Sequence, residues 1–489
     1  MGGRVRGGFP SRALSLWGFF NVGFGAVIGS CWLLLIGDWM IGGGGPVSVV
    51  AAFLLGMVLM VPIGSVFGEL SAALPFTGGP TEFVARTHGE LASTVVGWAF
   101  VLGNGIVPAW DTLTLSVILT EVIGPVPGFS WLCGIKLYTV FGYSVYLIPS
   151  LVAVAVVIFV GKINMDSSLG AARIQLFLSY VQLVGMVVVL VAAIAHGSPA
   201  NASPSFAQIT TSPSIAGVTE ASTPLGGLLA VLAVTPYFFA GFDAVSQRAD
   251  EAAEGVNWNK FGKVIVLTIL ASAGFYIVTA YSFGTIEPWQ EFVSHRAPAF
   301  TALAAASPFA YIVVLVVAVF CPIGPMNSFV GATNFVLLSM ARRGQIPARI
   351  AEVDPRTGTQ RNAYRIVIAT AVLGPFLGTG MLELLAKVAS LALSVSYLMI
   401  SLSCLRMRQT EPDLPRPFRV PAGNVGVMSA ALASAFCIGI LVVPTSPAAI
   451  GPSEWAIVVI WSLLGIALSL VSRRRARSAE PSATGMRGA

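Results

Sequence analysis

Long apolar blocks, separated by short connections that carry most of the charge, dominate this chain of 489 residues. Many blocks reach about 20 residues, the length of a helix that crosses the hydrocarbon core of a bilayer. Only 10% of the residues are charged, against roughly a quarter in soluble domains. Because lipid offers no hydrogen-bond partner to exposed backbone groups, blocks of this kind must fold as helices. The sequence therefore predicts an all-α integral membrane protein without a separate globular domain.

About twelve blocks are predicted as membrane-spanning helices, each bounded by residues of lower hydropathy. Their ranges are 13–41, 46–68, 92–123, 140–161, 172–196, 225–247, 262–284, 308–340, 363–380, 382–405, 424–444 and 455–472.

The basic residues indicate how the chain is oriented. With the N-terminus inside, 24 of the 27 Lys and Arg residues lie on the cytoplasmic side, and the exceptions are Lys136, Arg296 and Lys387. Membrane proteins carry this positive bias in their cytoplasmic connections. We therefore expect a multi-pass protein of the plasma membrane with both termini in the cytoplasm. The excess of Arg over Lys favours a bacterial inner membrane.

The order of the spans predicts two related units. A cytoplasmic segment 1–12 precedes five spans at 13–196, the external connection 197–224 follows, and five more spans occupy 225–405. Each group begins with a Gly-interrupted helix, and an odd number of spans inverts the second group in the membrane. Residues 406–472 add a loop and two spans before the cytoplasmic tail 473–489. The prediction is a 5+5 inverted repeat plus two C-terminal helices.

The two interrupted helices carry residues that disfavour a continuous helix at mid-membrane depth. Span 1 contains Gly23, Gly25 and Gly29 within GFGAVIGSCW, and span 6 contains Pro236 and Gly241 within TPYFFAGFD. Close packing through Gly25 and Gly29 is an alternative reason for the glycines. The GxGxxxG spacing, with no strand before it, argues against a dinucleotide fingerprint.

Paired breaks create an environment that suits a zwitterion. Amide N–H groups at half-helix N-termini attract an anionic group, and freed carbonyls at half-helix C-termini attract a cationic group. The aromatic residues Tyr237, Phe238, Phe239 and Phe242 offer cation–π contact or a gate against water, although aromatic residues in a span more often serve packing.

Five stretches resemble the amino acid, polyamine and organocation (APC) superfamily, whose members have the LeuT-type fold. They are Ile28-Gly29-Ser30, Phe67 to Ser71 with Gly78-Gly79, Phe239 to Asp243 with Asp250 and Glu251, SMARRGQIP at 339–347, and PDLPRPFRVP at 412–421. The resemblance covers nearly the whole chain, and the last two stretches are its most specific part. It implies a secondary active transporter, working by alternating access, for a small amino acid or related amine. A polyamine or organic-cation transporter or exchanger is the alternative.

The resemblance also implies a substrate site. The backbone around Val27, Ser30 and Cys31 receives the substrate carboxylate, and carbonyls near Val27, Tyr237 and Ala240 receive the amine. Asn104 in span 3 is a further candidate contact. Together, the predicted substrate-binding residues are Gly25, Ala26, Val27, Gly29, Ser30, Cys31, Asn104, Tyr237, Phe238, Phe239, Ala240 and Gly241.

Three residues depart from the pattern of the superfamily. Cys31 stands where relatives commonly have Gly, and Trp32 where they commonly have an aliphatic residue. The side chain of Cys31 occupies space, which favours a small or unusual substrate. Gln182 occupies the apparent place of a lysine whose ammonium substitutes for a bound ion in many relatives. Coupling to protons or sodium, exchange and uniport therefore all stay open.

Asp111, Gln182 and Asp243 are the candidates for coupling. An intramembrane carboxylate costs about 2.5–3.5 kcal/mol unless it faces a cavity or a partner. Asp111 therefore either faces a cavity, where it holds a substrate amine or a proton, or lies in water at the outer mouth of a long span 3. A structural role near the cytoplasmic span ends is favoured for Asp243 and Glu69.

Other functional classes lack their residues in this sequence. The five cysteines are scattered, and His88, His196 and His295 lie at span ends or in connections, so no disulfide framework or metal site is indicated. No HExxH motif or nucleophile elbow suggests an enzyme, and short termini disfavour an amino-acid sensor on the same fold. We expect no cofactor and no nucleic-acid partner, and the expected partners are a small-molecule substrate and membrane lipid.

Overall fold

A computed structural model describes residues 14–75, 79–140, 142–166, 168–209, 218–249, 252–355 and 359–479 of the chain. Several sequence predictions fall outside these ranges: the segment 1–12, Gly78, the acids Asp250 and Glu251, and the end of the tail from residue 480.

The described chain is mainly helical. Its helices are α1 (Leu16–Val27), α2 (Cys31–Leu34), α3 (Ile36–Gly43), α4 (Pro46–Ala73), α5 (Gly79–Val117), α6 (Leu147–Asp166), α7 (Ser168–His196), α8 (Pro224–Phe238), α9 (Phe242–Gln247), α10 (Trp258–Ile286), α11 (Trp289–Phe292), α12 (Pro298–Ala306), α13 (Pro308–Phe320), α14 (Ile323–Arg342), α15 (Arg361–Leu373), α16 (Met381–Thr410), α17 (Gly423–Val442) and α18 (Pro452–Ala479).

Among the described residues, eleven helical segments are long and apolar enough to cross a membrane, which confirms the all-α, multi-pass class. The predicted span 363–380 is the one that differs. It folds as α15, of 13 residues, followed by the 3₁₀ turn Gly374–Phe376. At 1.5 Å per residue, a helix of this length extends about 20 Å, which is less than the roughly 30 Å hydrocarbon core. The prediction of about twelve spans is thus in keeping with the eleven segments, and 363–380 forms a helix shorter than a full span.

The start of the predicted span 140–161 is also wrong. Residues Lys136–Val140 and Tyr143–Tyr146 form an antiparallel hairpin, β1 and β2, in which Val140 pairs with Tyr143 and Lys136 with Tyr146. This stretch is rich in Tyr, Val and Thr, which favour strands. The helix α6 begins only after the hairpin, at Leu147.

The predicted span 92–123 is the apolar part of a longer segment. α5 begins at Gly79 and bends at Gly89, whose φ of 83° and ψ of 177° are not helical. It ends in a π-helical turn, Ile118–Ile123. Asn104 and Asp111 both lie after the bend, within the apolar part.

Short polar side chains fix the starts of several helices. Ser15 accepts a hydrogen bond from the amide of Gly18 at 3.2 Å, and Thr223 accepts one from Gly226 at 3.0 Å. The side chain of Asn257 accepts such a hydrogen bond at the start of α10, and that of Ser307 accepts one at the start of α13. These bonds satisfy amides that have no partner in the first helical turn.

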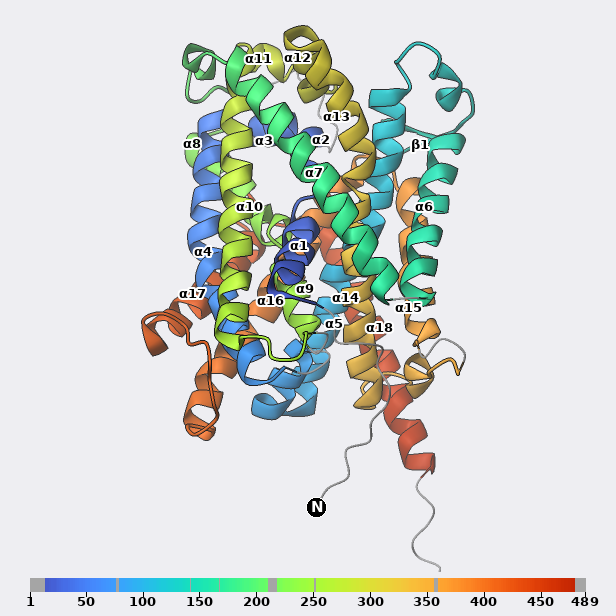
Figure 1. Ribbon diagram of the computed structural model, residues 1–489, viewed down its shortest axis with the longest axis vertical. Helices are drawn as coiled ribbons and strands as arrows, with labels where there is room; N and C mark the ends of the chain where they lie inside the picture. The colour runs from blue at the N-terminus through green and yellow to red at the C-terminus, as the bar shows by residue number, and fades with distance from the viewer. Residues whose placement is uncertain are drawn as a thin grey trace, which may run out of the picture.

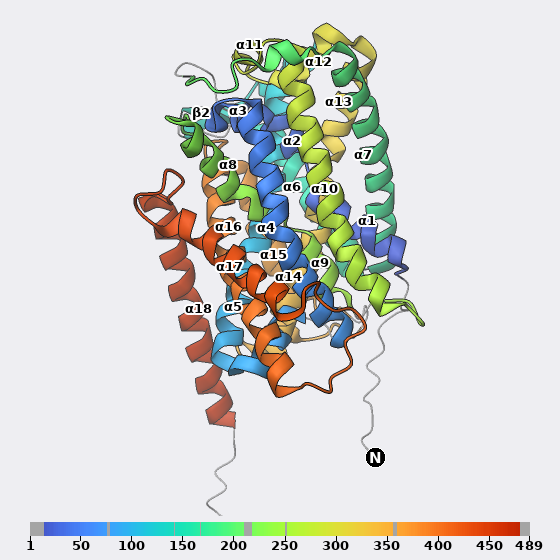
Figure 2. The same ribbon diagram turned by 90° about the vertical axis from the view of Figure 1, so that its left-hand side faces the viewer.

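The interrupted helix α1 lies inside the bundle. It contacts α7, α9, α10 and α14, and Figure 1 shows it between α10 and α7. The hairpin, α11 and α12 lie at one end of the molecule, and α18 extends toward the other end. Figure 2 shows α17 and α18 on one flank, where most described side chains of α18 are exposed, as expected of a lipid-facing helix.

Ion pairs link several helices at the end of the bundle opposite the hairpin. Glu69 of α4 is fully buried, lies 2.5 Å from Nη2 of Arg408 in α16, and accepts a hydrogen bond from the amide of Val420 at 2.7 Å. Arg343, after α14, pairs with Glu82 and Glu90 of α5. Hydrogen bonds to Glu90, together with Glu82, raise the pKa of Arg343 above its ordinary value. These pairs cross-link the ends of four helices.

Candidate functional site

The first break lies between α1 and α2. α1 ends at Val27, Ile28 is extended with φ of −88° and ψ of 98°, and α2 begins at Cys31. Within the described chain, the amides of Gly29, Ser30, Cys31 and Trp32 make no hydrogen bond to another backbone group. Four successive free N–H groups form a surface that favours an anion.

Side chains from neighbouring helices satisfy two carbonyls of this break. The hydroxyl of Tyr276 in α10 donates to the carbonyl of Val27 at 2.9 Å and lies 3.3 Å from Sγ of Cys31. Nε2 of Gln182 in α7 donates to the carbonyl of Ile28. The break is therefore a supported structure, because buried carbonyls left without donors would be costly in a membrane.

The second break lies between α8 and α9. α8 ends at Phe238, Gly241 has φ of 132°, and α9 begins at Phe242. Oδ1 of Asp243 accepts a hydrogen bond from the amide of Gly241 at 2.8 Å, and its Oδ2 accepts one from Gln247 at 3.1 Å. Asp243 thus stabilises the break itself.

The two breaks touch at Gly241. A Cβ atom at this position would lie 2.7 Å from the amide nitrogen of Val27 and 3.0 Å from the carbonyl carbon of Ala26. Such distances leave no room for a side chain, and the φ of 132° also requires glycine. The interruptions of spans 1 and 6 therefore meet in the structure.

A small cavity of about 30 Å³ lies where the breaks meet. It has room for roughly two water molecules. Its lining comes from the two breaks, from α5 and from α14: Ala26, Val27, Gly29, Cys31, Val107, Trp110, Asp111, Tyr237, Phe238, Ala240, Pro325 and Phe329.

Most of this lining matches the predicted residues. Seven predicted substrate-binding residues line the cavity, namely Ala26, Val27, Gly29, Cys31, Tyr237, Phe238 and Ala240, as does the coupling candidate Asp111. Gly25 in the last turn of α1, and Ser30, Phe239 and Gly241 in the breaks, are not part of the lining.

Asn104 lies away from the cavity lining. Its Nδ2 donates to Oε1 of Gln247 at 3.3 Å, so that it joins the polar group around Asp243. Both residues are fully buried. In this structure, Asn104 supports the second break from α5 and does not contact the cavity.

Asp111 faces the cavity and is only 2% exposed, so it does not lie in water at an outer mouth. Its Oδ2 has no hydrogen-bond partner within the described chain. Oδ1 lies 3.8 Å from the point that a Cβ atom on Gly29 would occupy. The carboxylate therefore stands beside the free amides of the first break.

Aromatic rings form one wall of the cavity. The ring centroids of Trp110 and Tyr237 are 5.9 Å apart, and those of Tyr237 and Phe238 are 5.4 Å apart. Nε1 of Trp110 donates to the carbonyl of Leu382 at 3.1 Å, which fixes the indole in α5 against α16. A rigid aromatic wall beside a carboxylate suits a cationic group.

Trp32 points away from this wall. It is fully buried against α10, where its ring meets Phe275 edge to face at 5.1 Å. Of the two departures in span 1, only Cys31 reaches the cavity.

Gln182 belongs to a buried polar region between α1, α7 and α14. Nδ2 of Asn327 donates to Oε1 of Gln175 at 2.9 Å, and Nδ2 of Asn164 donates to Oδ1 of Asn327 at 2.8 Å. Nε2 of Gln175 lies 2.5 Å from the Cβ position of Gly25. This region holds side-chain amides, including that of Gln182 at the apparent place of the lysine of many relatives, and no basic side chain in the described chain joins its hydrogen bonds.

Sequence reasoning missed Tyr276, Val107, Pro325 and Phe329. Tyr276 was one hydroxyl within an apolar span, and nothing in its neighbourhood marked it. Pro325 had a signal, since Pro322 and Pro325 interrupt span 8 as α13 passes into α14.

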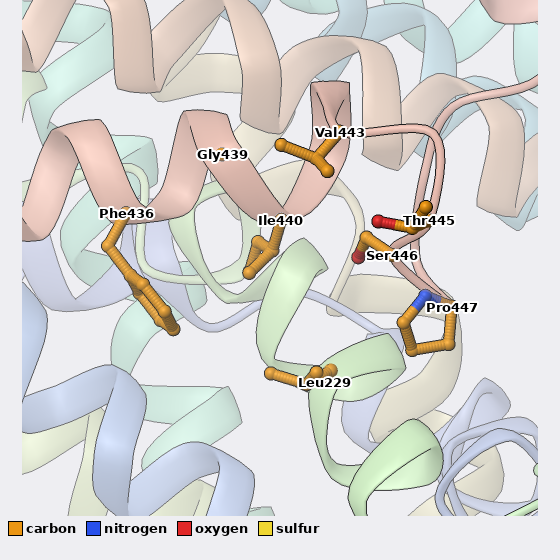
Figure 3. A pocket seen from close by; sticks show the side chains of 8 residues that line it. All are labelled: Leu229, Phe436, Gly439, Ile440, Val443, Thr445, Ser446 and Pro447. Carbon is orange, nitrogen blue, oxygen red and sulfur yellow. The ribbon is translucent and has the colours of Figure 1, made fainter.

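A larger cavity of about 360 Å³ lies elsewhere, between α8, α17 and the connection that follows α17. Figure 3 shows Phe436 and Ile440 of α17 on one side and Leu229 of α8 on the other. Its remaining lining residues are Gly439, Val443, Thr445, Ser446 and Pro447. This lining is mainly apolar and has no charged side chain.

The chain is similar in sequence to known proteins. A family model described as "Amino acid permease" matches residues 14–464. The chain is similar to the branched-chain amino acid permease BcaP of Bacillus subtilis, with 22% identity over 95% of this chain and 93% of that protein. It is also similar to the aspartate-proton symporter of B. subtilis (24% identity, 83% and 75% covered) and to the glutamate/serine transporter AimA of the same organism (23%, 85% and 74%).

Proposed function

This chain belongs to the amino acid permease family, a family of transporters and not of enzymes, and on that premise we propose that it carries a small amino acid across the membrane by alternating access. The observation that carries the proposal is the meeting of two helix breaks at one enclosed cavity. The names of the similar proteins include branched-chain amino acids, aspartate, glutamate and serine, so the substrate must be argued from the site.

The carboxylate of the substrate binds at the first break. The amides of Gly29, Ser30, Cys31 and Trp32 have no backbone partner within the described chain, and unpaired peptide N–H groups at a helix start attract anions. Gly29 and Cys31 also line the cavity, so a ligand there reaches their amides directly.

Substrate entry requires a change of shape. The cavity of about 30 Å³ is too small for an amino acid, and its lining residues Val27, Cys31 and Trp110 are less than 5% exposed. The site is thus enclosed from both sides, as expected of an intermediate in which neither gate is open. The ion pairs around Glu69 and Arg343 form the cytoplasmic gate, since the basic residues place that end inside.

Substrate size is limited by Cys31. Its Sγ lies in the cavity wall, 3.3 Å from the hydroxyl of Tyr276, where glycine would leave room. Cys31→Gly should broaden the range toward larger amino acids. An unchanged size preference in transport assays would contradict this role.

Coupling does not depend on a lysine at position 182. Gln182 is uncharged and donates to the carbonyl of Ile28, so it cannot carry a proton between the two faces. Exchange or uniport needs no titrating group at position 182. Coupling to sodium or to a proton would have to use residues other than Gln182.

An organic-cation or polyamine transporter is the second candidate, because Asp111 places a carboxylate in the cavity wall. Purified full-length protein in proteoliposomes separates the candidates. Labelled neutral, acidic and cationic amino acids and amines are tested with and without sodium, a proton gradient and internal substrate. Uptake of amino acids supports the proposal, whereas uptake of none of these compounds under any gradient contradicts it.

A further inference from the structure

Asp111 is a buried carboxyl group without a charged partner in the part of the chain that the structure describes. It is 2% exposed, its Oδ2 has no hydrogen-bond partner, and no Lys, Arg or His pairs with it in the described ranges. Burying a charge without a partner is costly, and an ionisable group inside a membrane is by default functional. Because Asp111 faces the cavity, a ligand in that cavity can supply the partner.

The backbone carbonyls that the resemblance assigns to the substrate amine are largely in use. The carbonyl of Val27 accepts from the hydroxyl of Tyr276 at 2.9 Å. The carbonyl of Tyr237 accepts from the amide of Ala240 at 3.0 Å. The neighbouring carbonyl of Ile28 accepts from Gln182. Two of these carbonyls and a neighbouring one already accept a hydrogen bond from the protein. Few backbone carbonyls are therefore left to bind an ammonium group in the cavity.

Asp111 lies beside the free amides of the first break, so its carboxyl group is a neighbour of any substrate carboxylate bound there. Its Oδ1 is 3.8 Å from the Cβ position of Gly29, the residue that begins the run of free amides. The carboxylate and the ammonium of an α-amino acid are attached to one carbon atom. One small substrate can thus place its carboxylate on the amides and its ammonium on Asp111.

The surroundings of Asp111 favour an organic cation over a metal ion. Rings of Trp110, Tyr237, Phe238 and Phe329 share the cavity wall with it, and such rings attract ammonium groups. A sodium or calcium ion instead requires a shell of several oxygen ligands. No group of three or more metal-ligating side chains is found in the described residues.

We propose that Asp111 accepts the ammonium group of the transported substrate, so that this one side chain makes the amine indispensable for recognition. The inference rests on the proposed function and deepens it by defining the substrate class. Two consequences follow. An amine that lacks a carboxylate still binds, and a carboxylic acid that lacks the amine does not. The described cavity lining contains no basic side chain that could receive a second carboxylate, so acidic amino acids are poor substrates.

Matched sets of compounds test the proposal on the purified full-length protein. The probes are L-alanine with ethylamine and propionate, and L-leucine with isopentylamine and 4-methylpentanoate. Binding is read from the ligand-dependent rise of the melting temperature, which does not require transport, and uptake is measured in proteoliposomes.

Three variants are compared with the wild type. Asp111→Asn removes the charge and keeps the shape, and Asp111→Glu keeps the charge. Thr114→Val is the matched control, because its hydroxyl donates to the backbone of Trp110 at 2.5 Å one turn along the same helix. Size-exclusion profiles establish that each variant is folded before binding is compared.

The proposal expects the amines and amino acids to bind the wild type and the deaminated acids to bind weakly. Asp111→Asn should weaken amine binding by about 10-fold to 100-fold, as expected for the loss of a hydrogen bond to a charged group. Asp111→Glu should restore part of it, and Thr114→Val should change little. Deaminated acids that bind wild type as well as the amines do would overturn the proposal, as would amine binding that Asp111→Asn leaves intact.

The test separates this inference from the proposed function. If Asp111→Asn binds and transports amino acids like the wild type, the amine site is wrong while amino-acid transport stands. If Asp111→Asn binds them normally but loses proton-driven uptake, Asp111 holds a proton and the inference is also wrong. If the wild type neither binds nor transports any probe, the proposed function itself fails.

Discussion

Gly241→Ala tests whether the contact between the two breaks holds the site together. Gly241 has φ of 132° and ψ of −33°, a region that residues with a side chain rarely occupy. An added Cβ would stand 2.7 Å from the amide nitrogen of Val27, whereas an ordinary contact is 3.4–4 Å. Since the opposing atom is backbone, the whole break of α1 would have to shift away from α9.

The expected cost has two parts. Backbone strain at a sparsely populated φ/ψ contributes about 1–3 kcal/mol, and overpacking against the α1 backbone contributes about 1–3 kcal/mol. The sum is about 2–6 kcal/mol. Gly274→Ala in α10 is the matched control, because its Cβ would meet nothing within 4 Å. There the substitution should be neutral or stabilising by up to about 1 kcal/mol, owing to the higher helix propensity of alanine.

Both variants are measured for melting temperature in detergent and for uptake in proteoliposomes. Gly241→Ala should melt well below the wild type and lose most uptake, because the displaced Val27 and Ala26 line the cavity. Gly274→Ala should match the wild type in both measurements. If Gly241→Ala melts and transports like Gly274→Ala, the two breaks do not depend on this contact, and the central argument about the site is wrong.

Further variants probe three other parts of the structure. Tyr276→Phe leaves the carbonyl of Val27 without its donor, while the ring still stacks on Phe53 at 4.8 Å. The substitution should lower the free energy of unfolding by about 1–3 kcal/mol and weaken substrate binding. An unchanged affinity for substrate would refute a role of Tyr276 in shaping the break. A small methanethiosulfonate reagent should inhibit uptake by modifying Cys31, and bound substrate should protect the thiol from the reagent. Uptake by Cys31→Ser should resist the reagent. Equal inhibition of Cys31→Ser would show that the reactive thiol lies elsewhere. Glu69→Gln leaves Arg408 and Arg416 without their buried carboxylate and should destabilise the protein by about 3–5 kcal/mol. Glu411→Gln, which removes the carboxylate of the more exposed pair with Arg86, should cost at most about 1 kcal/mol. Similar losses of thermal stability in the two variants would contradict this ranking.

The membrane class and the interrupted helices could be read from the sequence because they depend on local rules. A long apolar block must be a helix in lipid, wherever it packs. Glycine and proline weaken a helix by their own covalent structure. Gly25 to Cys31 and Pro236 to Asp243 therefore marked both breaks, and seven of the cavity-lining residues were predicted from them.

Two errors in the elements have local causes as well. The hairpin of β1 and β2 is moderately apolar, so hydropathy extended the following helix over it. The segment 363–380 is apolar enough to resemble a span, but its helix ends at Leu373 and continues as a 3₁₀ turn that contains Pro375.

By itself, the sequence determined that the chain is a bundle of membrane helices with paired interruptions, because hydropathy and backbone flexibility are properties of single residues and their neighbours. Only the tertiary structure decided which side chains serve the breaks. The bend of α5 and its packing against α14 and α16 turn Asp111 inward, α10 brings Tyr276 to Val27, and Trp32 turns away toward Phe275. These choices depend on helix rotation and tilt, which are set by contacts between segments far apart in the chain.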